Sequence, residues 1–207
     1  MPNWCNNTVT LEHDDPAMIA RAKASFADGR FLAEFIPVPK SLQIVAGCAG
    51  SHDSPEQIAL VEAEENNIKA HGYKNWYDFC VNEWGTKWDV GGGDGSINDI
   101  EGGIIVSFES AWSPPIGAYE KLHEMGFKIL AMYYEPGMAF AGVWEDGIDD
   151  YYEYGGLDSA GIAEELPSAL DEAFGISECV AEWEAENAED EENLEIDLDG
   201  GLSATNE

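Results

Sequence analysis

The sequence predicts an α+β fold, and three observations carry that prediction. Residues 3–12 and 103–112 alternate apolar and polar side chains with the period of two that a half-buried strand requires. Other segments carry apolar residues at helical spacing, with Pro near their first turns and Gly near their ends. The composition, 44% hydrophobic and 11% aromatic, is typical of a chain that buries a core.

The first half of the chain predicts a strand, a helix and an inserted helical region. The strand over 3–12 leads into a helix that begins at Pro16. The segment FLAEFIPVPKSL is expected to be extended, because Pro37 and Pro39 remove amide donors and bias their predecessors away from helix. A helical insertion follows at about 46–86. The apolar side of its first helix is expected to be Ile58, Val61 and Ile68.

The second half predicts two strands, a helix and a hairpin. Trp88-Asp89-Val90 is expected to be a strand, joined to the strand at 103–112 by a turn-rich stretch. A helix follows from Ile116, and residues 127–144 predict a hairpin around Glu135-Pro136-Gly137, which 148–155 can extend. The order β–α–(insertion)–β–β–α–β matches the split β-α-β arrangement of ferredoxin-like folds, an antiparallel sheet with helices on one face.

This pattern predicts a ferredoxin-like domain over residues 1–156, with an acidic C-terminal extension over 157–207. The extension is expected to hold short helices broken at Pro167 and to end in a disordered tail.

Negative charge is the strongest compositional signal. The chain has 42 acidic and 9 basic residues, a formal net charge of −33, and its last Lys or Arg is Lys128. More than half of the acids follow that residue. Such a field repels nucleic acid and anionic membranes and attracts basic protein surfaces.

Several functional classes find no support in the sequence. No fingerprint of a P-loop, a dinucleotide site, a zinc protease or a serine hydrolase is present, so no catalytic residue is predicted and an enzyme is disfavoured. The four cysteines are widely spaced and pair with no histidine at metal-site spacing, so we expect reduced structural thiols, no metal and no cofactor. No apolar segment reaches the roughly 20 residues of a membrane span, and no signal peptide begins the chain, which predicts a cytoplasmic protein.

Four longer sequence segments resemble a known family. MPNWCNN at 1–7, NEWGTKWDV at 82–90, FESAWSPP at 108–115 and YYEPGMAFAG at 133–142 together resemble the YubB ferredoxin-like domain family, over residues 1 to about 150. Members are poorly characterised proteins of bacterial plasmids and phages. The resemblance implies a ferredoxin-like fold and a phage or plasmid origin, hence a host cytoplasm, and it implies no activity.

These segments are rich in tryptophan, and two interpretations stay open for them. Large aromatic side chains at strand ends are usually core anchors. Alternatively, the rings line a ligand cleft to which asparagine and lysine side chains add polar contacts. The candidate ligand-binding residues are Trp4, Asn6, Asn82, Trp84, Lys87, Trp88 and Trp112.

Two further features of this region have competing interpretations. Lys87 is a lone base among acids, expected either to bind an anionic ligand or, more commonly, to pair with a nearby carboxylate. The segment GGGDGSINDIEGG at 91–103 lacks the Lys of a phosphate loop and the Gly and Glu positions of a calcium loop, so a flexible hairpin connection is the favoured interpretation.

Two functions are therefore predicted. The first is a non-enzymatic, protein-binding inhibitor that mimics DNA, with a basic nucleic-acid-binding host protein as partner and no direct contact with nucleic acid or membrane. Its candidate residues are Asp149, Asp150, Glu164, Glu165, Asp171, Glu172, Glu189, Asp190, Glu191 and Glu192. The alternative is a small-molecule or peptide binding module that uses the Trp-rich cleft. Acidity that serves only solubility or a high-salt habitat is the simpler explanation of the charge.

Overall fold

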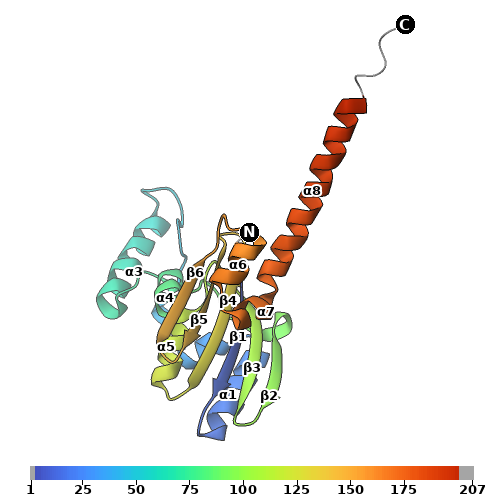
Figure 1. Ribbon diagram of the computed structural model, residues 1–207. Coiled ribbons are helices and arrows are strands. Elements are labelled where there is room, and N and C mark those ends of the chain that lie inside the picture. The colour runs from blue at the N-terminus through green and yellow to red at the C-terminus, as the bar shows by residue number, and fades with distance from the viewer. Residues whose placement is uncertain (1–2, 201–207) are drawn as a thin grey trace. The chain divides into compact units, whose positions relative to one another are not determined.

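The computed structural model describes residues 3–200, and the side chains of residues 94 and 189–200 are outside the description. Figure 1 shows the elements in chain order. They are β1 (Trp4–Glu12), α1 (Pro16–Ala27), α2 (Phe31–Phe35), η1 (Lys40–Leu42), α3 (Pro55–His71), α4 (Trp76–Glu83), η2 (Gly92–Asp94), β2 (Ser96–Ile100), β3 (Gly103–Ala111), α5 (Ile116–Glu124), β4 (Lys128–Glu135), β5 (Phe140–Glu145), β6 (Ile148–Glu153), α6 (Ser159–Glu165), α7 (Ser168–Phe174) and α8 (Ile176–Gly200).

The strands form one sheet in the order β2-β3-β1-β4-β5-β6 (Figure 1). β1 is central, and it pairs antiparallel with β3 and with β4, so that Thr8 lies opposite Ser107 on one side and Met132 on the other. Strands β4, β1, β3 and β2, with α1 and α5 as the connecting helices, have the split β-α-β order of a ferredoxin-like fold. The predicted fold class is therefore confirmed.

The core lies on one face of this sheet. Along β1, Cys5, Asn7, Val9 and Leu11 are buried while the alternate residues are partly exposed, as the period of a strand requires. Helices α1, α2, α4 and α5 supply the other half of the core cluster. Within the described residues, no helix has both the length and the apolar character needed to cross a membrane.

The chain divides into two compact units, Met1–Tyr151 and Tyr152–Glu207. In the second unit, Ser159 donates hydrogen bonds from its backbone N–H and its hydroxyl to Glu184, which ties α6 to α8. Pro167 separates α6 from α7, as the sequence predicts. Residues 201–207, the end of the predicted disordered tail, lie outside the described residues.

The second strand is not where the sequence places it. Residues 88–90 are not a strand, and β2 is formed instead by Ser96–Ile100, inside the stretch that reads as a hairpin connection. Asn and Asp have low strand propensity, but an edge strand needs only one ladder partner, here β3. The chain just before β2 passes close to α1: a Cβ on Gly91 would lie 2.3 Å from the carbonyl oxygen of Phe26.

Two expectations for the helices are also wrong. FLAEF, expected to be extended, forms α2, because Asp89 accepts hydrogen bonds from the N–H groups of Leu32 and Ala33 at its first turn. That partner is distant in sequence, so local propensity does not reveal it. On α3 the expected apolar side is exposed, and the buried residues are Leu60 and Asn67. The exposed residues are Ile58, Val61 and Ile68.

Candidate functional site

The four sequence segments that carry the family resemblance meet at one end of the sheet. The carbonyl of Asn3 accepts a hydrogen bond from the N–H of Trp112, at 2.9 Å. The Thr86 hydroxyl donates to the carbonyl of Ala111 and accepts from its N–H, both at 3.1 Å. A Cβ on Gly137 would lie 2.6 Å from Nδ2 of Asn3, so the β4–β5 turn also reaches this end.

The end of α4 and the start of α5 are in close backbone contact, which fixes where residues 86–88 emerge. Gly85 has φ +86°, and a Cβ there would lie 3.0 Å from the backbone nitrogen of Ile116. A Cβ on Gly117 would lie 2.9 Å from the carbonyl oxygen of Glu83. The Ser113 hydroxyl donates to the carbonyl of Gly85 at 2.6 Å. This contact requires glycine, and it directs the chain toward the end of β3.

Trp84 belongs to the core and not to the site. Its side chain is 4% exposed, its ring packs edge-on against Phe79, and its indole N–H donates to the carbonyl of Ile36 at 3.0 Å. For this residue the core-anchor interpretation applies, and its ligand-binding role is not supported.

The other three predicted tryptophans form an exposed row. Trp4 at the start of β1, Trp88 in the loop after α4 and Trp112 after β3 are 41%, 40% and 42% exposed. Ring centroids are 5.9 Å apart for Trp4 and Trp88, with planes inclined by 36°, and 6.4 Å apart for Trp88 and Trp112, with planes inclined by 24°. We call Trp4, Trp88 and Trp112 the tryptophan row.

The backbone of Trp112 is in the left-handed region, with φ +68°. A bulky residue seldom adopts this conformation, which costs roughly 1–3 kcal/mol. The hydrogen bond from its N–H to Asn3 holds the turn that places the ring on the row. Glycine would relieve the strain. The sequence nevertheless places an indole side chain here, where the backbone conformation favours a residue without a side chain.

Lys87 lies over the aromatic rings of this surface. Its Nζ is 4.5 Å from the ring centroid of Trp88, 5.3 Å from that of Trp112 and 5.7 Å from that of Tyr77. These distances are within the range of cation–π contacts. No salt bridge joins it to a carboxylate among the described side chains, so the expected ion pair is not observed.

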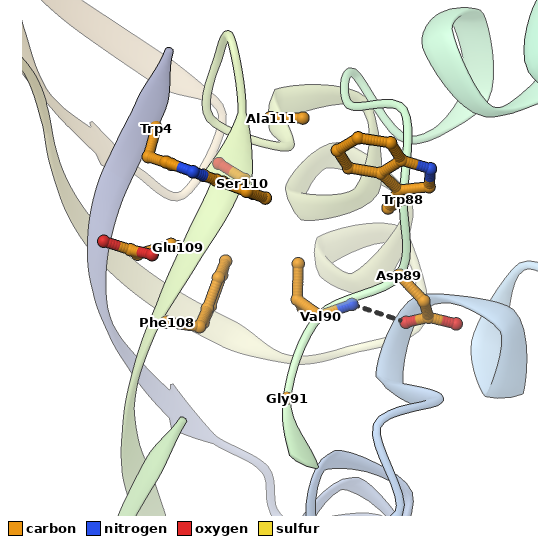
Figure 2. Close-up of a pocket in the computed structure, with 9 residues that line it drawn as sticks. All are labelled: Trp4, Trp88, Asp89, Val90, Gly91, Phe108, Glu109, Ser110 and Ala111. Carbon is orange, nitrogen blue, oxygen red and sulfur yellow. Dashed lines mark hydrogen bonds between the residues drawn. The ribbon is translucent and has the colours of Figure 1, made fainter. Parts of the chain in front are cut away.

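A cavity of about 160 Å³ lies beside the row. It exists because β2 begins at Ser96, opposite Ser107, so the last residues of β3 have no strand on that side. The chain from Trp88 to Gly91 runs alongside them instead. Figure 2 shows the lining residues, with Trp4 on β1, Phe108 to Ala111 on β3, and Trp88 on the segment that runs along the other side of β3. They are Trp4, Trp88, Asp89, Val90, Gly91, Phe108, Glu109, Ser110 and Ala111.

Asp89 anchors the segment that carries Trp88. Its carboxylate accepts from the N–H groups of Leu32 at 2.7 Å, Ala33 at 2.9 Å and Val90 at 2.9 Å. Burial raises the pKa of this carboxyl above its ordinary value, although the three N–H donors act in the opposite direction. Asp89 therefore fixes both the start of α2 and the position of the row.

Two open grooves flank Trp112 on its other sides. One, of about 440 Å³, lies between Trp76, Tyr77, Lys87 and Trp112. The second, of about 400 Å³, is lined by the segment after β3 and by side chains of β4, β5 and β6. Its aromatic and acidic members are Trp112, Tyr133, Phe140, Asp149 and Tyr151. Tyr77 and Tyr151 are not predicted from the sequence, since only the fold brings them to Trp112.

Neither of the two predicted asparagines lines the cavity or the two grooves. Asn82 is exposed on α4, and its amide donates to the carbonyl of Asp78 at 2.7 Å. Asn6 lies on the strand face opposite the core and lines none of the cavities described here. The buried asparagine of this strand is Asn7, which bonds to the hydroxyls of Ser110 and Tyr119.

The predicted acidic residues are spread over several elements, and two of them have structural roles. Asp149, on β6, accepts from the Tyr133 hydroxyl at 2.7 Å. Asp171, on α7, accepts from the N–H and the hydroxyl of Ser177. Asp150, Glu164, Glu165 and Glu172 are exposed. The side chains of Glu189, Asp190, Glu191 and Glu192 lie outside the described residues, and DNA mimicry stays a prediction.

The cysteines show no reactive arrangement. Cys5 and Cys80 are buried, and burial raises the pKa of each thiol to about 12, which keeps it protonated. Cys48 and Cys179 are exposed, whereas structural thiols are expected to be buried. Among the described side chains, His, Cys, Asp and Glu form no cluster of metal-site geometry.

Comparisons with known proteins find a distant structural similarity and no family. No protein-family model matches the sequence, and no curated protein matches it. Among solved structures, the crystal structure of a protein api92 from Yersinia pseudotuberculosis, of family-model DUF1281, is similar to this chain with a TM-score of 0.39 and 12% sequence identity. The similarity covers 75% of this chain and 99% of that one.

Proposed function

We propose that this protein is a binding module that uses the tryptophan row to take a small molecule or a peptide segment. The observation that carries the proposal is Trp112, whose ring is kept exposed on a strained backbone and stacked on Trp88. Backbone strain of this kind persists only where the surrounding structure stabilises it, and strained residues are more frequent at ligand-binding sites.

Exposure of three indole rings at one place supports the same proposal. Isolated apolar residues on a surface are common, but a contiguous group marks an interaction site. Each ring has an apolar face and an N–H group, and tryptophan is enriched among residues that dominate binding energy. The row also adjoins a cavity and two grooves, so a ligand stacked on it can bury further surface.

The net charge narrows the ligand class. A formal charge of −33 disfavours polyanions, so stacking of single-stranded nucleic acid on these rings is opposed electrostatically. A neutral or cationic ligand meets no such opposition.

The proposal is tested by screening the full chain against a small-molecule fragment library and a peptide library, with calorimetry on the hits. A ligand at about 100 times its Kd stabilises the folded state by about 2.7 kcal/mol, which a thermal scan detects. We expect hits that bind the native chain and lose at least about tenfold in affinity in Trp88→Ala.

Trp183→Ala is the matched control, because Trp183 is 64% exposed in the second unit and outside the row. It should retain full affinity, and both variants should keep the native far-UV spectrum. Hits that bind Trp88→Ala as well as the native chain, or the absence of any hit, would contradict the proposal.

A further inference from the structure

We infer that the tryptophan row and its grooves take an extended, proline-rich peptide segment that carries Lys or Arg. This inference rests on the proposed function and names its ligand class.

The row offers hydrogen-bond donors that have no acceptors among the described residues. Trp84 donates its indole N–H to a carbonyl, whereas no hydrogen bond among the described residues uses the indole N–H of Trp4, Trp88 or Trp112. Lys87 adds an ammonium group that has no carboxylate partner among the described residues. The part of a matching ligand that lies over the middle of the row therefore brings acceptors and few donors.

Proline-rich segments have that property. Polyproline II helices make no internal hydrogen bonds, so their carbonyls are free to accept, and proline carries no N–H. A β-strand or a polar peptide would present further N–H donors, and the indole N–H groups and the Lys87 ammonium offer no acceptor for them. A carbonyl-rich backbone with apolar rings thus complements a surface of indole N–H groups and ring faces.

The spacing of the rings also matches a polyproline II helix. Successive ring centroids of the row are 5.9 Å and 6.4 Å apart, and a polyproline II helix rises about 3.1 Å per residue. Each step along the row therefore spans about two residues of such a peptide. The small cavity beside Trp88 and the grooves beside Trp112 lie where pyrrolidine rings could insert between aromatic side chains.

The charges around the row complement a peptide with basic ends. Glu109 is exposed at the cavity beside Trp4, and Asp149 lies in the groove beyond Trp112. Acidic groups therefore stand at both ends of the row, with Lys87 alone at its centre. A peptide with basic residues near its ends and prolines between them matches that distribution, and the net charge of −33 steers it to the protein.

The test uses synthetic peptides of about ten residues, which extend to roughly 30 Å as polyproline II. A panel with proline at alternating or consecutive positions and with Arg or Lys near the ends is titrated calorimetrically into the full chain. Two matched panels replace every proline by glycine or every basic residue by glutamate. We expect saturable binding of proline-rich basic peptides and at least about tenfold weaker binding of both matched panels.

The same titrations with Trp88→Ala and Trp183→Ala locate the site. Loss of binding in Trp88→Ala with retention in Trp183→Ala supports the inference. Equal affinity for the glycine panel overturns it, as does failure of every proline-rich peptide. If the peptides fail while small molecules still bind in a Trp88-dependent way, the peptide inference falls and the proposed function stands. If nothing binds in that way, both fall.

Discussion

Trp84 and Trp88 lie four residues apart in one sequence segment, yet they belong to two different regions of the molecule. Trp84 is 4% exposed, and its indole N–H is satisfied by the carbonyl of Ile36. Trp88 is 40% exposed and stacks between Trp4 and Trp112. The region around Trp84 is a buried core that packs α4 against α5. The tryptophan row is an exposed surface whose position depends on that core.

One tryptophan-rich segment therefore contributes both to the core and to an exposed surface. Gly85 and Ser113 fix the backbone between the two regions, so the packing of the first sets the geometry of the second. Substitutions in the core region should therefore lower stability, and substitutions in the row should lower binding with little change in stability.

The largest expected effect is that of Trp84→Ala, which tests the core side of the comparison. Removing a buried aromatic ring creates a cavity and leaves a carbonyl without its donor, so we expect a loss of about 3–5 kcal/mol in the free energy of unfolding. Urea denaturation followed by circular dichroism measures it. A loss below about 1 kcal/mol would show that Trp84 is not a core residue.

Asn7→Ala should cost less, about 2 kcal/mol, since it leaves the buried Tyr119 hydroxyl without its acceptor. Asn7 is 2% exposed and also donates to Ser110 at 2.8 Å. The exposed Asn82→Ala serves as the control, with a change within about 0.5 kcal/mol. Equal urea midpoints for the two variants would contradict this account of the buried network.

Asp89→Ala links the two regions and should affect both measurements. Loss of the carboxylate leaves the N–H groups of Leu32 and Ala33 at the start of α2 without their acceptor, at a cost of about 1 kcal/mol. Because Asp89 also anchors Trp88, binding at the row should weaken in the same variant. The exposed Asp53→Ala should change neither quantity, and unchanged binding in Asp89→Ala would disprove the anchoring role.

Lys87→Met should have a smaller effect on stability, because methionine keeps an apolar chain over the rings and removes only the charge. Loss of the cation–π contacts should cost about 0.5–1 kcal/mol at this partly exposed site. Lys74→Met is the control, and urea denaturation of both variants measures the difference. A loss above about 2 kcal/mol would mean that Lys87 is a structural residue.

The sequence predicts much of this architecture and only part of the site. Strand periodicity, Pro16 and the Glu135-Pro136-Gly137 turn are local signals, and the elements they predict are present. Helix α2 and the start of β2 depend on Asp89 and on pairing with β3, which are partners distant in sequence. For the same reason the sequence could name the four tryptophans but could not separate Trp84 from the row, or bring Tyr77 and Tyr151 to Trp112.

The free energy of unfolding of Trp112→Gly shows whether Trp112 is an exposed residue of the tryptophan row or a residue of the core. Glycine accepts φ +68° without strain, a relief of roughly 1–3 kcal/mol. This relief offsets most of what is lost with the ring, which is the stacking, worth about 0.5–1.5 kcal/mol, and the area that the half-exposed ring buries. We predict a value within about 2 kcal/mol of the native chain, in a variant that no longer binds ligands of the row. A loss of 3 kcal/mol or more, as expected for Trp84→Ala, would contradict the claim and return Trp112 to the core.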